Sequence, residues 1–212
     1  MSDARQAQQE IEFKLDLGSF TNYLKLVGFL GQIDDEERHR NGFFDSEDRR
    51  LSKAGWALRV RAETGRGLVT IKSLAGPSET AFVREEIESV IDRSLATEIL
   101  EDRRSVMQLD VAPVAVLKER VGPIEVDLLV RFENTRQRKA FRFGDHEYTL
   151  EIDRTEFPLG QVDYELEVEI PDLSRVEVVE DGLRKLFGSL GIPYERQAET
   201  KLARALRHAG IE

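Results

Sequence analysis

The stretch EIEFKL, residues 10–15, alternates three charged residues with three apolar ones. In a β-strand, successive side chains point to opposite faces, so Glu10, Glu12 and Lys14 share one face and the apolar residues share the other. Such a charged face can be an ordinary solvated surface. It can also belong to a site for a metal and an anion together, because carboxylates suit a divalent cation and an ammonium group suits an anion.

The composition excludes several classes of protein. The chain has 212 residues and a net charge of −10, which argues against a general binder of nucleic acid or of anionic membranes. It has no cysteine, so it can form neither a disulfide framework nor a thiolate metal site. No apolar run approaches the ~20 residues of a membrane span, and the N-terminus has no apolar signal region. We therefore expect a cytoplasmic protein.

Strand patterns dominate the chain, and helical patterns interrupt them at about 20–30, 94–109, 173–190 and 196–208. The connections are short, and the strands do not alternate regularly with helices. This order favours an antiparallel sheet or barrel with peripheral helices, an α+β fold, over a doubly wound α/β fold.

Charged faces recur on the strands after EIEFKL. They carry Arg59 and Arg61; Lys72; Arg84, Glu86 and Glu88; Glu125 and Asp127; Arg136 and Arg138; Glu151 and Asp153; and Glu165, Glu167 and Glu169. On any one strand a solvated face is the simpler interpretation, but like charges two residues apart gain nothing from each other there. Repetition over seven or more strands instead favours a charged interior. Such an interior would suit a chain of phosphates bridged to Mg²⁺ or Mn²⁺, since carboxylates bind the metal and Arg and Lys bind phosphate oxygens.

Taken in order, these segments resemble the CYTH superfamily, also called triphosphate tunnel metalloenzymes. The Glu-x-Glu-x-Lys pattern of Glu10, Glu12 and Lys14 is the hallmark of that family. The other matching elements are ALRVR (57–61), TIKS (70–73), REEIE (84–88), FENTRQR (132–138), LEID (150–153), YELEVE (164–169) and ETKLAR (199–204). The resemblance implies a single CYTH domain over residues 1–212, with its motifs in 10–206. It also implies a closed eight-stranded antiparallel β-barrel, a tunnel with peripheral helices.

The resemblance also implies roles for individual residues. The expected phosphate ligands are Lys14, Arg59, Arg61, Lys72, Arg136, Arg138 and Lys201. The expected ligands of Mg²⁺ or Mn²⁺ are Glu10, Glu12, Glu86, Glu88, Glu151, Asp153, Glu165 and Glu167. The expected catalytic set is Glu10, Glu12, Lys14, Glu165 and Glu167, and more than one carboxylate could orient the attacking water.

The function that this implies is metal-dependent hydrolysis of inorganic triphosphate by in-line attack on a terminal phosphoryl group. Hydrolysis of an organic triphosphate such as thiamine triphosphate, cyclisation of ATP by a class IV adenylate cyclase, and non-catalytic binding of polyphosphate are the alternatives. The many carboxylates speak against a pure binding module. The aromatic residues Phe43, Phe44, Trp56 and Tyr164 are expected to pack the barrel, which favours a substrate without a large ring. The expected partner is a small triphosphate, and the oligomeric state stays open.

Two sets of residues are expected to have no role in the site. The histidines match no metal-ligand spacing and are expected to be surface or partly buried residues: His39, His146 and His208. Four arginines outside the strands are expected on solvated helix faces: Arg103, Arg104, Arg204 and Arg207.

Overall fold

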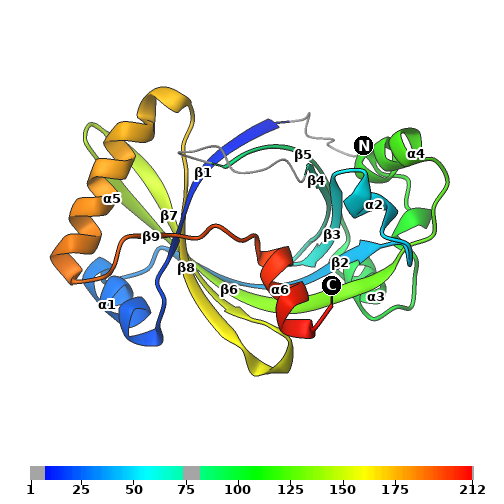
Figure 1. The fold of residues 1–212 in the computed structure, drawn as a ribbon, viewed down its shortest axis with the longest axis horizontal. Helices are drawn as coiled ribbons and strands as arrows, with labels where there is room; N and C mark the ends of the chain where they lie inside the picture. Colours follow the sequence, from blue (N-terminus) through cyan, green and yellow to red (C-terminus); the bar gives the residue numbers. More distant parts are fainter. Residues whose placement is uncertain (1–7, 74–81, 212) are drawn as a thin grey trace.

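The computed structural model describes residues 8–73 and 82–211. In these residues one antiparallel sheet of nine strands has the order β5-β4-β3-β2-β6-β7-β8-β1-β9 (Figure 1). The strands are β1 (Gln8–Asp16), β2 (Asp35–Asp45), β3 (Trp56–Ala62), β4 (Gly67–Ser73), β5 (Phe82–Ile91), β6 (Asp127–Phe143), β7 (His146–Glu156), β8 (Val162–Glu169) and β9 (Glu195–Arg196). The helices are α1 (Phe20–Leu30), α2 (Arg50–Lys53), α3 (Arg93–Leu100), α4 (Ala112–Val121), α5 (Val176–Leu190) and α6 (Lys201–Ala209). Short 3₁₀ turns lie at Val106–Gln108, Pro158–Gly160 and Leu173–Arg175.

The prediction of a closed eight-stranded barrel is wrong. Within the described residues the sheet has nine strands in an order that runs from β5 to β9, with an additional pairing of β5 with β1. The ninth strand has two residues, Glu195 and Arg196, which pair with the end of β1. So short a strand carries no alternation pattern, and for this reason the sequence did not indicate it. The architecture is a strongly curved nine-stranded sheet.

Strand β6 is a second departure from the sequence pattern. The sequence pattern put Asp127 and Arg136 on different strands, but Asp127–Phe143 form one strand of 17 residues. Its N-terminal part pairs with β2, its C-terminal part pairs with β7, and residues 133–138 pair with both. One long strand therefore joins the two halves of the sheet.

The helices cover the apolar faces of the strands. On one side, α1 and α5 pack on β1, β7 and β8 through residues such as Leu26, Phe187 and Leu15. On the other side, α2, α3 and α4 pack on β3 and β4 through Leu58 and Ile71 (Figure 1). Because strand side chains alternate, burial of these apolar faces turns the charged faces the other way, toward the hollow of the sheet.

The ends of the helices follow from local capping. Helix α1 begins after Ser19, whose hydroxyl accepts from the backbone N–H of Asn22 at 3.2 Å. The predicted helix over 94–109 is wrong in its second half, since α3 ends at Leu100 and Asp102 takes a positive φ of 58°. Helix α6 begins at Lys201, later than predicted, because the Thr200 hydroxyl accepts from the N–H of Ala203 at 3.0 Å. No described helix is long and apolar enough to cross a membrane.

Candidate functional site

The charged faces of the strands meet around one cavity of about 260 Å³. Charged lining residues come from strands β1 and β3 to β8 and from α6, with a few apolar side chains at the edges. The predicted site residues in its lining are Glu12, Lys14, Arg59, Arg61, Lys72, Glu86, Glu88, Arg136, Arg138, Glu151, Glu167 and Lys201. The structure thus brings together residues from both halves of the sequence.

Three buried carboxylates form a cluster beside this cavity, and one of them, Glu167, lines it. Oxygen atoms of Asp153, Glu165 and Glu167 all lie within 4.8 Å of one another. Asp153 on β7 is directly opposite Glu165 on β8, and Glu167 follows two residues later on the same face. Each of the three is at most 5% exposed. Buried carboxylates at this spacing repel one another and require cations.

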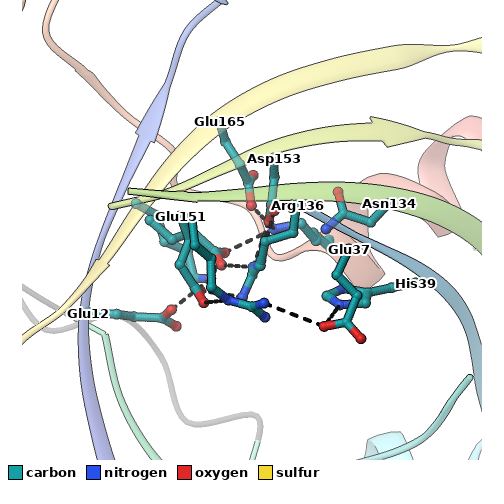
Figure 2. A network of polar contacts seen from close by, with 12 residues as sticks. Glu12, Glu37, His39, Asn134, Arg136, Glu151, Asp153 and Glu165 are labelled. Atoms are coloured by element: carbon teal, nitrogen blue, oxygen red, sulfur yellow. Dashed lines mark hydrogen bonds and ion pairs between the residues drawn. The ribbon is translucent and has the colours of Figure 1, made fainter. Parts of the chain in front are cut away.

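Cations from β6 and α6 compensate the carboxylate cluster (Figure 2). The Arg136 guanidinium donates to both oxygens of Asp153, at 2.8 Å from Nε and 2.6 Å from Nη2, and also contacts Glu151 and Glu167. The Lys201 ammonium lies 2.8 Å from Asp153 and 2.9 Å from Glu167, and it also contacts Glu165.

These contacts keep Asp153 and Glu167 ionised. Burial would raise the pKa of Asp153, but Arg136 and Lys201 hold it well below its ordinary value. Burial likewise acts to raise the pKa of Glu167, and Lys14 together with Arg136 outweighs that effect and lowers it. Ionised carboxylates are the form that binds a divalent cation.

Arginines from β3 form the opposite wall, and they are less well compensated. Nη2 of Arg59 lies 3.7 Å from Glu86, 3.8 Å from Glu88 and 3.2 Å from the Thr70 hydroxyl. Its Nε is buried and has no hydrogen-bond partner in the described part of the chain. Burial next to Arg59 and Arg136 lowers the pKa of Arg61 to about 10. This wall therefore carries positive charge that an anion would stabilise.

Glu12 and Lys14 of the EIEFKL stretch, together with Arg138, connect the carboxylate cluster with the rest of the cavity lining. The Lys14 ammonium lies 3.0 Å from Glu12 and also contacts Glu167. Burial acts to lower the pKa of Lys14, but these two carboxylates outweigh it and raise the pKa. Arg138 donates from Nε to Glu151 at 3.1 Å. Glu10 lies on β1 opposite Arg84, and its side chain falls outside the described part of the structure.

The predicted metal ligands do not all gather at one point. Only Asp153, Glu165 and Glu167 form a compact carboxylate group among the described residues. Glu12 is linked to that group through Lys14, whereas Glu86 and Glu88 lie beside Arg59 on the other wall. An all-oxygen set of three carboxylates fits a hard cation such as Mg²⁺ or Mn²⁺. These three side chains would hold such an ion, and it would supply positive charge beside them.

Arg204 is a site residue that the sequence did not indicate. It was expected on a solvated helix face, but it is 2% exposed and bridges Asp163, at 2.8 Å, and Glu165. Its position three residues after Lys201 puts both side chains on the same face of α6, and this spacing was the available signal. The expectation holds for Arg207, which is exposed and pairs with Glu199 at 2.8 Å.

His39 also differs from its expectation. It was expected at the surface or partly buried, but it is fully buried on β2, two residues after Glu37. Glu37 was not among the charged residues that the sequence pattern assigned to a strand face, but β2 begins at Asp35 and puts Glu37 on the same face as His39.

Comparison with known proteins agrees with this geometry. The CYTH domain family model matches residues 8–202. The structure of HpAC1 from Hippeastrum, described as an adenylyl cyclase candidate with a dominant triphosphatase activity, has 26% identity and a TM-score of 0.81, over 96% of this chain and 97% of that one.

Two further solved structures share the fold. An adenylate cyclase candidate from Bacillus halodurans has 22% identity and a TM-score of 0.67, over 92% of this chain and 97% of that one. The PH1819 protein from Pyrococcus horikoshii has 22% identity and a TM-score of 0.60, over 93% and 98%. No curated protein matches the sequence.

Proposed function

The chain belongs to the CYTH domain family, and from this premise we propose that it hydrolyses inorganic triphosphate to pyrophosphate and phosphate with the help of a divalent metal ion. The observation that carries the proposal is the pairing of two unlike walls in one cavity. A cluster of buried carboxylates lies on one side, and on the other side lies Arg59, whose nearest carboxylates are 3.7 and 3.8 Å away. A metal-bound triphosphate would satisfy both walls at once.

The proposed phosphate ligands are the cations around the cavity. Arg59 offers the least engaged guanidinium, so it is the first candidate for a bidentate contact with phosphate oxygens. Arg61, Lys72, Lys14 and Lys201 would add charge along the same cavity. The remaining two proposed ligands, Arg136 and Arg138, now contact carboxylates and would have to share those contacts with phosphate.

The proposed metal ligands are the carboxylates Asp153, Glu165 and Glu167, with Glu12 and Glu151 nearby and with Glu10, Glu86 and Glu88 as further candidates. The ion would neutralise charge on the phosphoryl oxygens. The protein's part is to hold the triphosphate in line and to orient a water at its terminal phosphorus. The P–O bond to the departing pyrophosphate breaks as the water oxygen bonds to phosphorus, and the water proton passes to a nearby carboxylate.

Inorganic triphosphate is favoured over larger substrates by the size and lining of the cavity. Its volume of about 260 Å³ is below the ~300–1,000 Å³ usual for pockets that enclose drug-sized ligands. The one aromatic residue in the described lining is Phe43, which packs on Phe132 with ring centroids 6.0 Å apart. The related Hippeastrum protein, with its dominant triphosphatase activity, supports the same reaction class.

The test is phosphate release from inorganic triphosphate, thiamine triphosphate and ATP, measured side by side with Mg²⁺ and with Mn²⁺. We expect the highest kcat/KM with inorganic triphosphate. A higher value with thiamine triphosphate, or cyclic AMP as the main product from ATP, would assign the site to the organic substrate instead. A single domain over residues 1–212 and a cytoplasmic location stay predictions.

A further inference from the structure

A second group of possible metal ligands lies outside the carboxylate cluster. Glu37, His39 and Glu63 each offer one ligand atom, and these atoms lie within 4.8 Å of one another. Glu37 and His39 share a face of β2, and Glu63 follows the end of β3 next to them. Figure 2 shows Glu37 and His39 side by side at the edge of the ion-pair network around Arg136.

The histidine in this group is fully buried and has unmet hydrogen-bonding capacity. His39 is 0% exposed, and neither of its ring nitrogens has a hydrogen-bond partner among the described residues. Buried polar atoms in folded proteins almost always have a partner, and leaving one unmet costs about 1–3 kcal/mol. The unmet Nε2 faces the two carboxylates.

The distances from His39 to the two carboxylates are close to those around a tetrahedrally coordinated metal ion. Nε2 of His39 lies 3.3 Å from Oε2 of Glu37 and 3.7 Å from Oε1 of Glu63. Around a tetrahedral Zn²⁺ with bonds of about 2.0–2.2 Å, neighbouring ligand atoms are about 3.4 Å apart. The separation from Glu37 therefore matches an edge of such a tetrahedron, and the separation from Glu63 is about 0.3 Å longer than one. Both exceed the ~3.2 Å upper limit of ordinary N–H···O hydrogen bonds.

The protonation states of His39 and Glu63 also suit coordination of a metal ion. Burial, together with the charges of Arg61 and Arg136, lowers the pKa of His39 to about 2, so the imidazole is neutral near pH 7. Burial acts to raise the pKa of Glu63, but its ion pairs with Arg66 and Arg61 outweigh burial and lower it. A neutral imidazole and ionised carboxylates are the forms that coordinate a metal ion.

Other contacts hold the carboxylates so that one oxygen of each faces the histidine. Oε2 of Glu63 accepts from Arg66 at 2.7 Å, which leaves Oε1 toward His39, 3.4 Å from Arg61. Oε1 of Glu37 accepts from the backbone N–H of Thr64 at 3.2 Å, which leaves Oε2 toward His39, 3.4 Å from Arg138. Such supporting contacts orient ligands around a metal.

We propose that Glu37, His39 and Glu63 form a second metal site that takes a transition-metal dication such as Zn²⁺, separate from the carboxylate cluster. A nitrogen donor favours Zn²⁺ and similar ions over Mg²⁺, which prefers oxygen ligands throughout. This inference goes beyond the proposed triphosphatase activity and does not depend on it. The competing explanation is an empty site in which an Nε2–H tautomer makes a long contact to Glu37.

The test is NMR of the ¹⁵N-labelled histidine rings during a titration with Zn²⁺, in saturating Mg²⁺ and without triphosphate. The chain has only three histidines, so the ring signals can be assigned with His146→Gln and His208→Gln variants. We expect the His39 ring nitrogens to shift to a bound form at about one equivalent of Zn²⁺, before the other two rings respond. Mg²⁺ alone should leave the His39 signals unchanged.

Variants on one strand supply the matched control. Glu37→Gln should weaken Zn²⁺ binding at least about tenfold, because an amide is a poorer ligand than a carboxylate. Glu36→Gln changes the neighbouring exposed residue, whose side chain contacts Gln137, and should bind Zn²⁺ like the parent. Because Glu37 is only half-buried, its variant should fold, and Glu63→Gln adds a second, buried position.

Two outcomes would overturn the proposal. In one, the His39 nitrogens keep the shifts of a free neutral ring in excess Zn²⁺. In the other, the Glu37→Gln and Glu63→Gln variants fold and bind Zn²⁺ as tightly as the parent. Loss of triphosphatase activity is not part of either outcome, so failure of the proposed function is a separate result.

Discussion

Replacement of Arg59 by lysine isolates the contribution of one guanidinium to the proposed phosphate wall. Both side chains carry one positive charge, but lysine lacks the planar fork that can donate to two phosphate oxygens. In the structure Arg59 makes only long contacts to Glu86 and Glu88, and its Nε is buried with no hydrogen-bond partner among the described residues. These donors are therefore available for a substrate.

The magnitude follows from the donors that Arg59→Lys removes. A hydrogen bond to a charged group contributes about 1.5–3 kcal/mol, and lysine can keep one of two such bonds. Loss of the other predicts a fall in kcat/KM of about 10- to 150-fold. The folded protein loses only the bond to Thr70, so its free energy of unfolding should fall by about 1 kcal/mol or less, which is about 2–4 °C in melting temperature.

The assay is steady-state phosphate release from inorganic triphosphate, with thermal unfolding of each variant alongside. Arg38→Lys is the matched control, because Arg38 is exposed on β2 and its side chain points away from the cavity. We expect the control to keep the parental kcat/KM. If Arg59→Lys also keeps it, Arg59 does not bind phosphate and the proposed role of this wall is wrong.

Three further predictions concern other residues of the site. Glu12→Gln should lose nearly all turnover yet unfold at the parental temperature, since Glu12 lines the solvent-accessible cavity. An unfolded Glu12→Gln variant would instead show that Glu12 has a structural role. Arg204→Ala should lower the free energy of unfolding by about 3–5 kcal/mol, because it leaves buried Glu165 without that partner. Arg207→Ala removes one side of an exposed ion pair and should change the free energy of unfolding by less than about 1 kcal/mol. Equal urea midpoints for the two variants would contradict this prediction. The pKa of His39 is lowered in the folded protein, so below about pH 6.5 the unfolded chain binds a proton at this histidine and the folded protein does not. In the presence of a chelator, the free energy of unfolding should therefore fall by about 1.4 kcal/mol for each pH unit below about pH 6.5. The same urea series on His39→Gln should lack that slope, and an equal slope in both proteins would show that His39 does not cause it.

The alternation of charged and apolar residues predicted which side chains meet around the cavity. Arg59, Arg61 and Lys72 line the cavity together with Glu12 and Lys14, because their apolar neighbours pack beneath the helices. Alternation assigns each residue to a face, and the apolar face of a strand is buried whatever the detailed pairing.

Alternation did not indicate how many strands the sheet has or whether the sheet closes. Pairing is decided by contacts between distant segments, and a two-residue strand such as β9 has no periodicity of its own. The sequence also did not indicate which single polar residues are buried. His39 and Arg204 have the composition of surface residues, and only the packing of β2 and α6 shows that both are enclosed.

The central claim is that the carboxylate cluster binds a metal ion that triphosphate hydrolysis requires. The most direct measurement is phosphate release from inorganic triphosphate by the parent protein, first in excess chelator and then after Mg²⁺ or Mn²⁺ is added back. Without metal, the carboxylates Asp153, Glu165 and Glu167 should repel the polyanion, so we expect no turnover in chelator and full recovery on addition of metal. Full turnover in excess chelator would contradict the account.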